Sequence, residues 1–428
     1  MYKRKSMKLG RIFGDLLSRL PVLGRFFRGI QSRYRQFRLH NQEQKDHHCR
    51  DTTARHKRPF SLFFYYDLLP QSPVTMVTGS SAETRSDRKL VERIIAAYTL
   101  SSAETKELGG PIWSSITTKS QDVHDALISG DVLTVTDLLR YPAQSNILYG
   151  FDMVFKENAH RKRADPQAGK ISAQLAHDNL VRLAETIGAI RTYLPEVDFQ
   201  ERAWNPEQLI TSIEETVGFT LQFPNTIPEE YGIQSSRGVV CTRAVQALYQ
   251  AWKLTQLKPF VQGEKTLEIG AGLGRTAFFA NLFGLTDYTI IDLPLANVAQ
   301  AYFLGTSLGE EQIVLHGEPA DGHSRIRVEN PTWFHSTKNH FNIALNCDSM
   351  VEIGIEDVEN YWRKLIQQAD LFMSINHEAQ SFRVTDLPKR LKVAPRCLRS
   401  LHPLRKGYVE ELFFLADIPA THTKSFQG

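Results

Sequence analysis

The sequence predicts an α/β protein whose Rossmann-like, mostly parallel sheet has seven strands, with helices on both faces and a helical region before it. Three observations predict this class. A buried strand at 266–269 runs directly into the glycine-rich turn 270–274, after which a helical pattern begins. Short apolar strands and amphipathic helices then alternate toward the C-terminus. A last strand at 408–415 follows, and we expect it to form an antiparallel hairpin with residues near 397–401.

The length of 428 residues allows two or three domains. We place a basic, partly disordered amphipathic arm at 1–85, a helical accessory region on the substrate side at 86–255, and the chemistry-bearing domain at 256–428. With 42% apolar and 23% charged residues, the composition excludes a wholly disordered or collagen-like chain. The four cysteines are scattered without CxxC spacing, which argues against a zinc site or a disulfide framework and favours a reducing compartment, the cytoplasm.

The first 60 residues are strongly basic. They hold 16 Lys or Arg and 4 Asp or Glu, a net charge of +12, whereas the remainder carries −8. Apolar residues recur at helical spacing from Leu9 to Leu20, before Pro21. Two interpretations stay open: a helix lying on an anionic membrane surface, or an extension that packs on the body. No apolar run reaches the roughly 18 residues of a spanning helix, so we expect peripheral membrane contact at most, and no nucleic-acid partner.

The middle of the chain predicts helices near 87–98, 121–140 and 174–194, with Asp87 as a cap of the first, and another that ends near Gly218. A further stripe runs from Val239 to Trp252, and we expect this helix to pack on the following domain. Arg237 and Arg243 beside it could reach an acidic ligand, or could be ordinary surface residues.

Further strands are predicted at 285–291, 312–316, 341–347 and 371–375, with a helix at 356–368. Ligands of such sheets bind at the carboxyl ends of the strands, where neighbouring strands end together. The residues expected at this edge are Glu268, Asp292, Asp348 and His377. Their convergence indicates a single binding site.

The spacing of the turn's glycines distinguishes two classes of ligand. Dinucleotide folds use GxGxxG, which places a pyrophosphate on a helix N-terminus. Here Gly270, Gly272 and Gly274 form the pattern GxGxG. Glu268, two residues before the first glycine, would repel a pyrophosphate, but it suits a ligand with a cationic amino-acid end. Asp292, after the second strand, can accept hydrogen bonds from both hydroxyls of a ribose. The segment EIGAGLG resembles motif I of class I S-adenosylmethionine-dependent methyltransferases, and this resemblance implies S-adenosyl-L-methionine as the ligand. A nicotinamide dehydrogenase stays open as the less favoured alternative.

Five segments in this order carry a resemblance: LEIGAGLGRTAFFA, YTIIDLPLANVAQAYFLG, NCDSMVEI, SINHEA and GYVEELFF. They resemble the sugar O-methyltransferase family of class I S-adenosylmethionine-dependent methyltransferases, and the likeness covers about 90–428. The resemblance implies methyl transfer to a sugar hydroxyl in polysaccharide or glycoconjugate biosynthesis, with a sugar or glycoconjugate acceptor. A methyltransferase for a non-sugar small molecule and a non-catalytic cofactor-binding scaffold in glycan assembly remain alternatives.

A sugar hydroxyl needs a base, because it is a poor nucleophile while protonated. His377 is the first candidate, since imidazole titrates near neutrality. Asp348 is the second, either as the base or as the partner that orients His377. Asn346 could hydrogen-bond the cofactor or the substrate. The spacing does not require a metal, although a divalent ion held by Asp348 with Glu378 or Glu352 stays open.

Overall fold

The computed structural model describes most of the chain beyond residue 86. The residues that it describes are 65, 74–76, 87–105, 118–165, 167–192, 204–319 and 325–416. The chain divides into two units, Met1–Leu62 and Phe63–Gly428, and all described residues belong to the second. The predicted helix between Leu9 and Leu20 lies outside the described residues, and the domain boundaries at 85 and 255 stay predictions.

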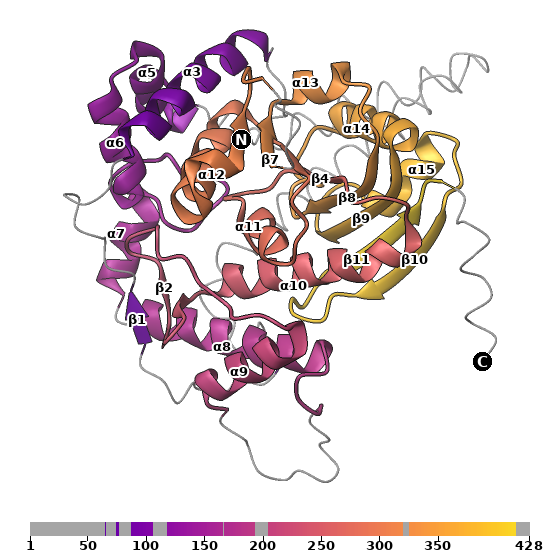
Figure 1. Ribbon diagram of the computed structural model, residues 1–428, viewed down its shortest axis with the longest axis horizontal. Coiled ribbons are helices and arrows are strands. Elements are labelled where there is room, and N and C mark those ends of the chain that lie inside the picture. Colours follow the sequence, from indigo (N-terminus) through magenta and orange to yellow (C-terminus); the bar gives the residue numbers. More distant parts are fainter. Residues whose placement is uncertain are drawn as a thin grey trace, which may run out of the picture. The chain divides into compact units, whose positions relative to one another are not determined.

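The main sheet has eight strands in the order β10-β11-β9-β8-β4-β5-β7-β6 (Figure 1). Its strands are β4 (Thr266–Ile269), β5 (Tyr288–Ile291), β6 (Ile313–Leu315), β7 (Ile326–Glu329), β8 (Phe341–Cys347), β9 (Ala369–His377), β10 (Arg396–Leu401) and β11 (Tyr408–Phe414). The six neighbouring strands β9, β8, β4, β5, β7 and β6 run parallel. Strand β11 is antiparallel to both β9 and β10. The expected class, a mostly parallel Rossmann-like sheet that ends in a hairpin, is confirmed.

The strand count differs from the expected seven because β7 was missed. Arg327 and Glu329 alternate with Ile326 and Val328 over only four residues, which does not read as a buried strand. In the fold β7 lies between β5 and β6, so the expected third strand is the edge strand β6. Strand β9 is also longer than expected, and His377 is its last residue instead of following it.

Helices cover both faces of the sheet. The first face carries α10 (Thr242–Leu257), α11 (Arg275–Leu282) and α12 (Pro294–Leu308), and the second carries α13 (Pro331–Ser336), α14 (Ile355–Gln368) and α15 (Leu387–Arg390). Successive strand residues point to opposite faces, so Ile343 and Leu345 join the first core and Ala344 joins the second. Two apolar layers thereby hold the sheet between them.

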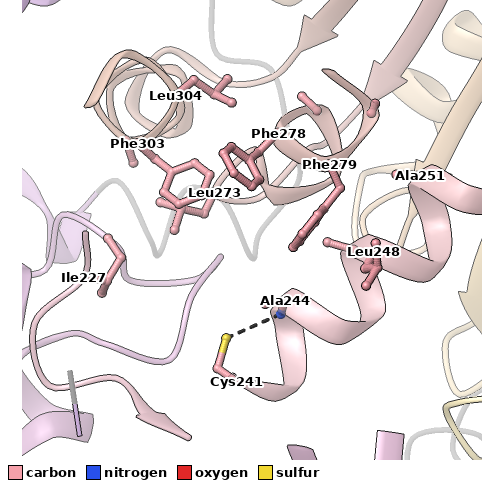
Figure 2. Packing of buried hydrophobic residues seen from close by; sticks show 14 of the residues in the cluster. Ile227, Cys241, Ala244, Leu248, Ala251, Leu273, Phe278, Phe279, Phe303 and Leu304 are labelled. Atoms are coloured by element: carbon pink, nitrogen blue, oxygen red, sulfur yellow. Dashed lines mark hydrogen bonds between the residues drawn. The ribbon is translucent and has the colours of Figure 1, made fainter. Parts of the chain in front are cut away.

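The first core ties the glycine-rich turn to the helices around it. Figure 2 shows Leu273 of that turn beside Phe278 and Phe303, which come from α11 and α12. Phe279 reaches toward Leu248 of α10 in the same view. Helix α10 thus packs on the strand–turn–helix unit, as the sequence predicted.

The preceding region is helical with one small sheet. Its helices are α3 (Arg88–Glu104), α5 (Gln121–Ser129), α6 (Val132–Arg140), α7 (Lys156–Ala164), α8 (Ala168–Thr186) and α9 (Pro206–Val217). The small sheet consists of β1 (Val74–Met76), β2 (Tyr231–Ser235) and β3 (Gly238–Val240). Short 3-10 turns lie at Pro142–Gln144, Lys258–Phe260, Glu310–Gln312 and Val384–Asp386. Within the described residues, no helix is long and apolar enough to span a membrane.

Three local expectations need correction here. The helix expected at 121–140 is two helices, because Gly130 adopts a left-handed φ of 73° and ends the first. Val239 and Val240 lie in β3, so α10 starts only at Thr242. Asp87 precedes α3 but does not cap it, since its carboxylate accepts hydrogen bonds from Arg140 and Tyr302 instead.

Candidate functional site

The glycine-rich turn leaves β4 at the carboxyl edge of the sheet. Gly270 has a φ of 74°, which favours glycine, and a Cβ there would come within 2.0 Å of the Ser349 hydroxyl oxygen. Ser349 follows β8, and its hydroxyl donates to the Ile269 carbonyl at 3.2 Å. The glycine is therefore required by the close approach of the β8 loop, as well as by the turn itself.

Glu268 lies inside the sheet beneath this turn. Its side chain is buried, and Oε2 accepts a hydrogen bond of 2.8 Å from the Tyr288 hydroxyl. Burial raises the pKa of Glu268 to about 7, although the bond from Tyr288 opposes the change. A cation placed against this carboxylate would favour its ionised form.

Asp292 directly follows β5 and faces the turn. One carboxylate oxygen accepts from the Ala271 amide at 3.0 Å and from the Gln300 side-chain amide at 2.7 Å. The other accepts from the Leu293 amide at 2.8 Å. Burial raises the pKa of Asp292 to about 6, against these hydrogen bonds. Gln300 also donates to the Gly272 carbonyl at 3.0 Å, so it fixes the acid and the turn together.

Two hollows open on either side of Gly270. The first is largely apolar and has Asp292 at one wall. It is lined by Ile269, Gly270, Ile291, Asp292, Leu293, Pro331, Ser349, Ile353, Asp357 and Tyr361. The second is polar and charged. Its lining residues are Phe151, Arg243, Gln246, Ala247, Gln250, Glu268, Gly270, Ala271, Gly272, Leu273, Arg275, Thr276, Cys347, Asp348 and Arg405. A ligand that filled both would have an apolar part with hydroxyls and a charged part.

Arg275, at the start of α11, lines the second hollow and is held in place by two acidic side chains. Its guanidinium pairs with Asp152 at 2.6 Å and with Glu230 at 2.7 Å. Burial raises the pKa of Asp152, but the charges of Arg275 and Arg243 outweigh it and lower the pKa to about 2. This buried ion pair joins the helical region to the glycine-rich turn.

Asp348 follows β8 and lines the second hollow. Its backbone has a left-handed φ of 66°, which is a strained conformation for a residue other than glycine. Its Oδ2 accepts from Arg405 at 2.9 Å, and its Oδ1 accepts from the Tyr408 hydroxyl at 2.8 Å. Burial raises the pKa of Asp348, but the charge of Arg405 and both hydrogen bonds outweigh burial and hold the pKa below its ordinary value. Asp348 is therefore a paired carboxylate.

His377 lies near Asp348 without a hydrogen bond to it. Its Nε2 is 4.0 Å from the Asp348 Oδ1, beyond hydrogen-bond range. Its Nδ1 accepts from the Ala379 amide at 3.2 Å, and its ring packs edge-on against Tyr408. The structure thus brings His377 and Asp348 to one edge, but it does not show Asp348 orienting the ring. Their catalytic roles stay predictions.

Asn346 is buried inside the sheet, and its side chain is committed to neighbouring protein groups. Its amide donates to the Ile269 carbonyl at 2.8 Å and to the Ser349 hydroxyl at 2.6 Å. Its oxygen accepts from the Met350 amide and from the Asn376 side chain. These bonds fit a positioning role for the turn and the β8 loop, and contact with a ligand stays a prediction.

Two further charged groups remain, of which Arg243 lines the second hollow and Glu352 lines neither hollow. Arg243, on the first turn of α10, is exposed and forms no hydrogen bond or ion pair with the described residues. Glu352, in the loop after β8, is half-buried. Burial and the charge of Asp348 raise the pKa of Glu352 to about 7, against Arg243 and Arg405. Arg237, in contrast, pairs with Glu214 at 2.7 Å outside this site.

The expected acids do not form a metal centre within the described part of the chain, where no group of three or more suitable side chains gathers. Glu378 pairs with Arg399 at 2.9 Å and so does not join Asp348.

Sequence reasoning missed the partners that fix the acids. Arg405 and Tyr408 come from the turn and strand after β10, and Gln300 comes from α12. The segment GYVEELFF was singled out in the sequence, but nothing in its spacing points to Asp348. Only the pairing of β11 with β9, in which Tyr408 lies opposite His377, brings these residues together.

No family model matches the sequence, and no curated protein sequence matches it. Solved structures do match part of the chain. A magnesium protoporphyrin IX methyltransferase from Synechocystis PCC 6803 with bound SAH is 9% identical, over 40% of this chain and 86% of that chain, with a TM-score of 0.28. The glycopeptide N-methyltransferase MtfA, complexed with S-adenosyl-L-homocysteine, is 13% identical, over 40% of this chain and 89% of that chain, with a TM-score of 0.29.

A tRNA (uracil-54, C5)-methyltransferase from Pyrococcus abyssi, in complex with S-adenosyl-L-homocysteine, is 11% identical. That match covers 41% of this chain and 38% of that chain, with a TM-score of 0.27. Likenesses at these scores decide neither the reaction nor the substrate, for which the geometry of the site is the guide.

Proposed function

We propose that the protein is an S-adenosylmethionine-dependent O-methyltransferase that acts on a sugar hydroxyl. The observation that carries the proposal is the pair of hollows that share Gly270, one largely apolar with Asp292 and Asp357 in its lining and one charged. A nucleoside joined to an amino acid is divided in the same way, because its base is largely apolar and its amino-acid end is charged. A dinucleotide would instead bring a pyrophosphate toward Glu268, against like charge.

The first hollow fits the nucleoside end. Asp292 is held by Gln300 and two amides with its carboxylate toward the turn, where it can accept hydrogen bonds from a ribose diol. Leu293, Ile353 and the other apolar side chains there offer a dry surface for a flat base. Binding a diol would also compensate the cost of burying the Asp292 carboxylate.

The second hollow fits the amino-acid end. Glu268 can hold an ammonium group, and Arg243, across the hollow on α10, can hold a carboxylate. The two residues have opposite charge, as a zwitterion requires. Gln246 and Gln250, on the same helix, also line the hollow.

When bound, S-adenosylmethionine supplies an activated methyl group on its sulfonium. The chain's own residues then have to place an acceptor oxygen in line with that methyl and exclude water. Asp348 and Arg405 line the same hollow, and their polar groups would suit a polyhydroxylated acceptor. The sequence resemblance to sugar O-methyltransferases supports the same acceptor class.

The direct test is transfer of radiolabelled methyl from S-adenosylmethionine to a panel of nucleotide sugars and purified polysaccharides, analysed before and after mild alkali. An O-methyl ether keeps its label in alkali, whereas a methyl ester releases it as methanol. We expect an alkali-stable sugar product. Label on non-sugar acceptors alone would replace the sugar assignment, and tight cofactor binding without transfer to any acceptor would favour the scaffold alternative.

A further inference from the structure

We propose that a groove between α10 and the β10–β11 hairpin binds a fatty acid, with its acyl chain on an apolar floor and its carboxylate at a basic mouth. The groove has a volume of about 760 Å³, within the range of roughly 300–1,000 Å³ that is typical of small-molecule sites. It shares no lining residue with either hollow beside the glycine-rich turn. The site is therefore separate from the cofactor site and goes beyond the proposed function.

The floor of the groove is a row of apolar side chains that crosses three strands. Leu412 on β11 lies opposite Leu398 on β10 and opposite Met373 on β9. Residues that lie directly opposite each other point to the same face of a sheet. Phe414, two positions after Leu412, points to this face as well. All four residues line the groove, so an acyl chain laid across these strands would contact apolar side chains.

The floor is open at β10, the edge strand of the sheet (Figure 1). All six residues of β10 are exposed and none belongs to either core, and Leu398 keeps 49% of its surface exposed. Helix α10 ends at Leu257, which lines the groove together with Phe260 of the following 3-10 turn. Among the described residues, no helix other than α10 lines it. An apolar surface left open beside a core marks a binding site.

The mouth of the groove is basic. Arg396 is exposed, and its guanidinium carbon lies 5.3 Å from the centroid of the Phe414 ring. Within the described residues it forms no ion pair. Lys253 of α10 also lines the groove, with Nζ 3.7 Å from Oε2 of Glu410, and the Glu410 carboxylate accepts a hydrogen bond from the Tyr249 hydroxyl. Arg396 is therefore the cation that an anionic ligand would meet.

The other charges near the groove favour the same kind of ligand. Arg399 and Glu411, the two remaining charged residues of the lining, pair with each other at 2.6 Å. Around them, residues 387–409 hold seven Lys or Arg and no Asp or Glu, so this edge of the sheet attracts anions. One unpaired guanidinium matches a head group with a single negative charge, which is the charge of a carboxylate.

An extended peptide is the other class of ligand that an edge strand can bind. A peptide that added to β10 would lie in the plane of the sheet, hydrogen-bonded to the free edge of the strand. It would leave Leu398, Leu412 and Met373 uncovered, because their side chains stand perpendicular to that plane. A chain that lies over the face of the sheet covers them, which favours the fatty acid.

Calorimetry of the full chain with decanoate tests the site. The wild type should bind decanoate, and octanoate and hexanoate should bind about fourfold more weakly for each methylene removed. Leu398→Glu should weaken binding by about tenfold or more, because it places a second carboxylate on the floor. Leu401→Glu is the matched control, since Leu401 lies on the same strand, is 81% exposed and does not line the groove. This control should bind decanoate like the wild type.

Arg396→Met leaves the floor intact and tests the mouth. It should weaken binding of decanoate about tenfold and leave binding of uncharged decanol near that of the wild type. If Leu398→Glu melts at the same temperature as Leu401→Glu and binds decanoate like the wild type, the fatty acid binds elsewhere on the chain and the assignment fails. Equal losses in both glutamate variants would overturn it as well. A wild type that does not bind decanoate would also overturn it, and would leave the edge of β10 to a peptide.

Discussion

Asp348 and Arg405 lie 57 positions apart in the sequence and meet with Oδ2 and Nη2 2.9 Å apart at the edge of the cleft. The Arg405 guanidinium also lies over the Tyr408 ring, 3.5 Å from its centroid, and Tyr408 donates to the other oxygen of Asp348. His402, which is buried, holds the turn by accepting from the Leu404 and Arg405 amides. The β10–β11 turn is thereby fixed to the loop after β8.

The first prediction concerns this pair. Arg405→Met should destabilise the fold by about 1–3 kcal/mol, because it leaves the half-buried carboxylate of Asp348 without its charge partner. Adding Asp348→Asn should recover part of the loss, with a coupling energy of about 1–2 kcal/mol in urea unfolding. The exposed pair Arg88–Glu92, treated in the same way, should show little coupling. Equal coupling in both pairs would contradict a special role for the cleft pair.

The second prediction concerns the glycine-rich turn. Gly270→Ala should cost about 1–3 kcal/mol and weaken cofactor binding, because the new Cβ meets Ser349 and the backbone keeps its left-handed φ. Ser349→Gly in the same chain should relieve the steric part and leave only the backbone part. The check is thermal denaturation of the single and double variants. If Ser349→Gly gives no relief, the two residues are not in the contact described.

The third prediction is a dependence of stability on pH. The pKa of Glu268 rises from 4.5 to about 7 on folding, so the folded state disfavours the ionised form. The associated stability is complete below pH 4.5 and is lost as the pH rises toward 7. Glu268→Gln cannot ionise, so it should gain on the wild type by up to about 3 kcal/mol between about pH 5 and pH 8. Melting curves without cofactor test this, and a gap that stays constant with pH would refute it.

The fourth prediction concerns the basic arm, whose residues 1–60 carry a net charge of +12. If the arm binds anionic lipid, deleting these residues should reduce sedimentation with vesicles that contain phosphatidylserine. The loss should shrink as salt is added, because screening weakens binding of the intact chain. Methyl transfer to a soluble acceptor should be unchanged. Equal vesicle binding by both chains would support the alternative, an extension that packs on the body.

Local patterns predicted much of the fold. Strands β4 and β8 match their predicted limits, since apolar residues recur in each and the next residue is a glycine after β4 and an aspartate after β8. The edge that gathers Glu268, Asp292, Asp348 and His377 followed from the rule for parallel sheets. Strand β7 was not predicted, because the apolar residues Ile326 and Val328 alternate there with the charged residues Arg327 and Glu329 over only four positions.

The state of each acid could not be predicted from spacing. Whether Asp348 is free or paired depends on Arg405, which reaches it only through the pairing of β11 with β9. Likewise the side chain of Asn346 is hydrogen-bonded to Ile269 and Asn376, which lie on two other strands. Protonation and hydrogen bonding depend on such long-range contacts, so a sequence names the candidates better than it assigns their roles.

The most direct measurement is calorimetry of S-adenosylhomocysteine and NAD with the wild type, Asp292→Ala and the remote surface control Asp122→Ala. The wild type and the control should bind S-adenosylhomocysteine and not NAD. Asp292→Ala should bind it about 10- to 150-fold more weakly, as expected for the loss of charge-assisted bonds to a ribose of about 1.5–3 kcal/mol. Binding of NAD alone, or undiminished binding by a folded Asp292→Ala, would contradict the account.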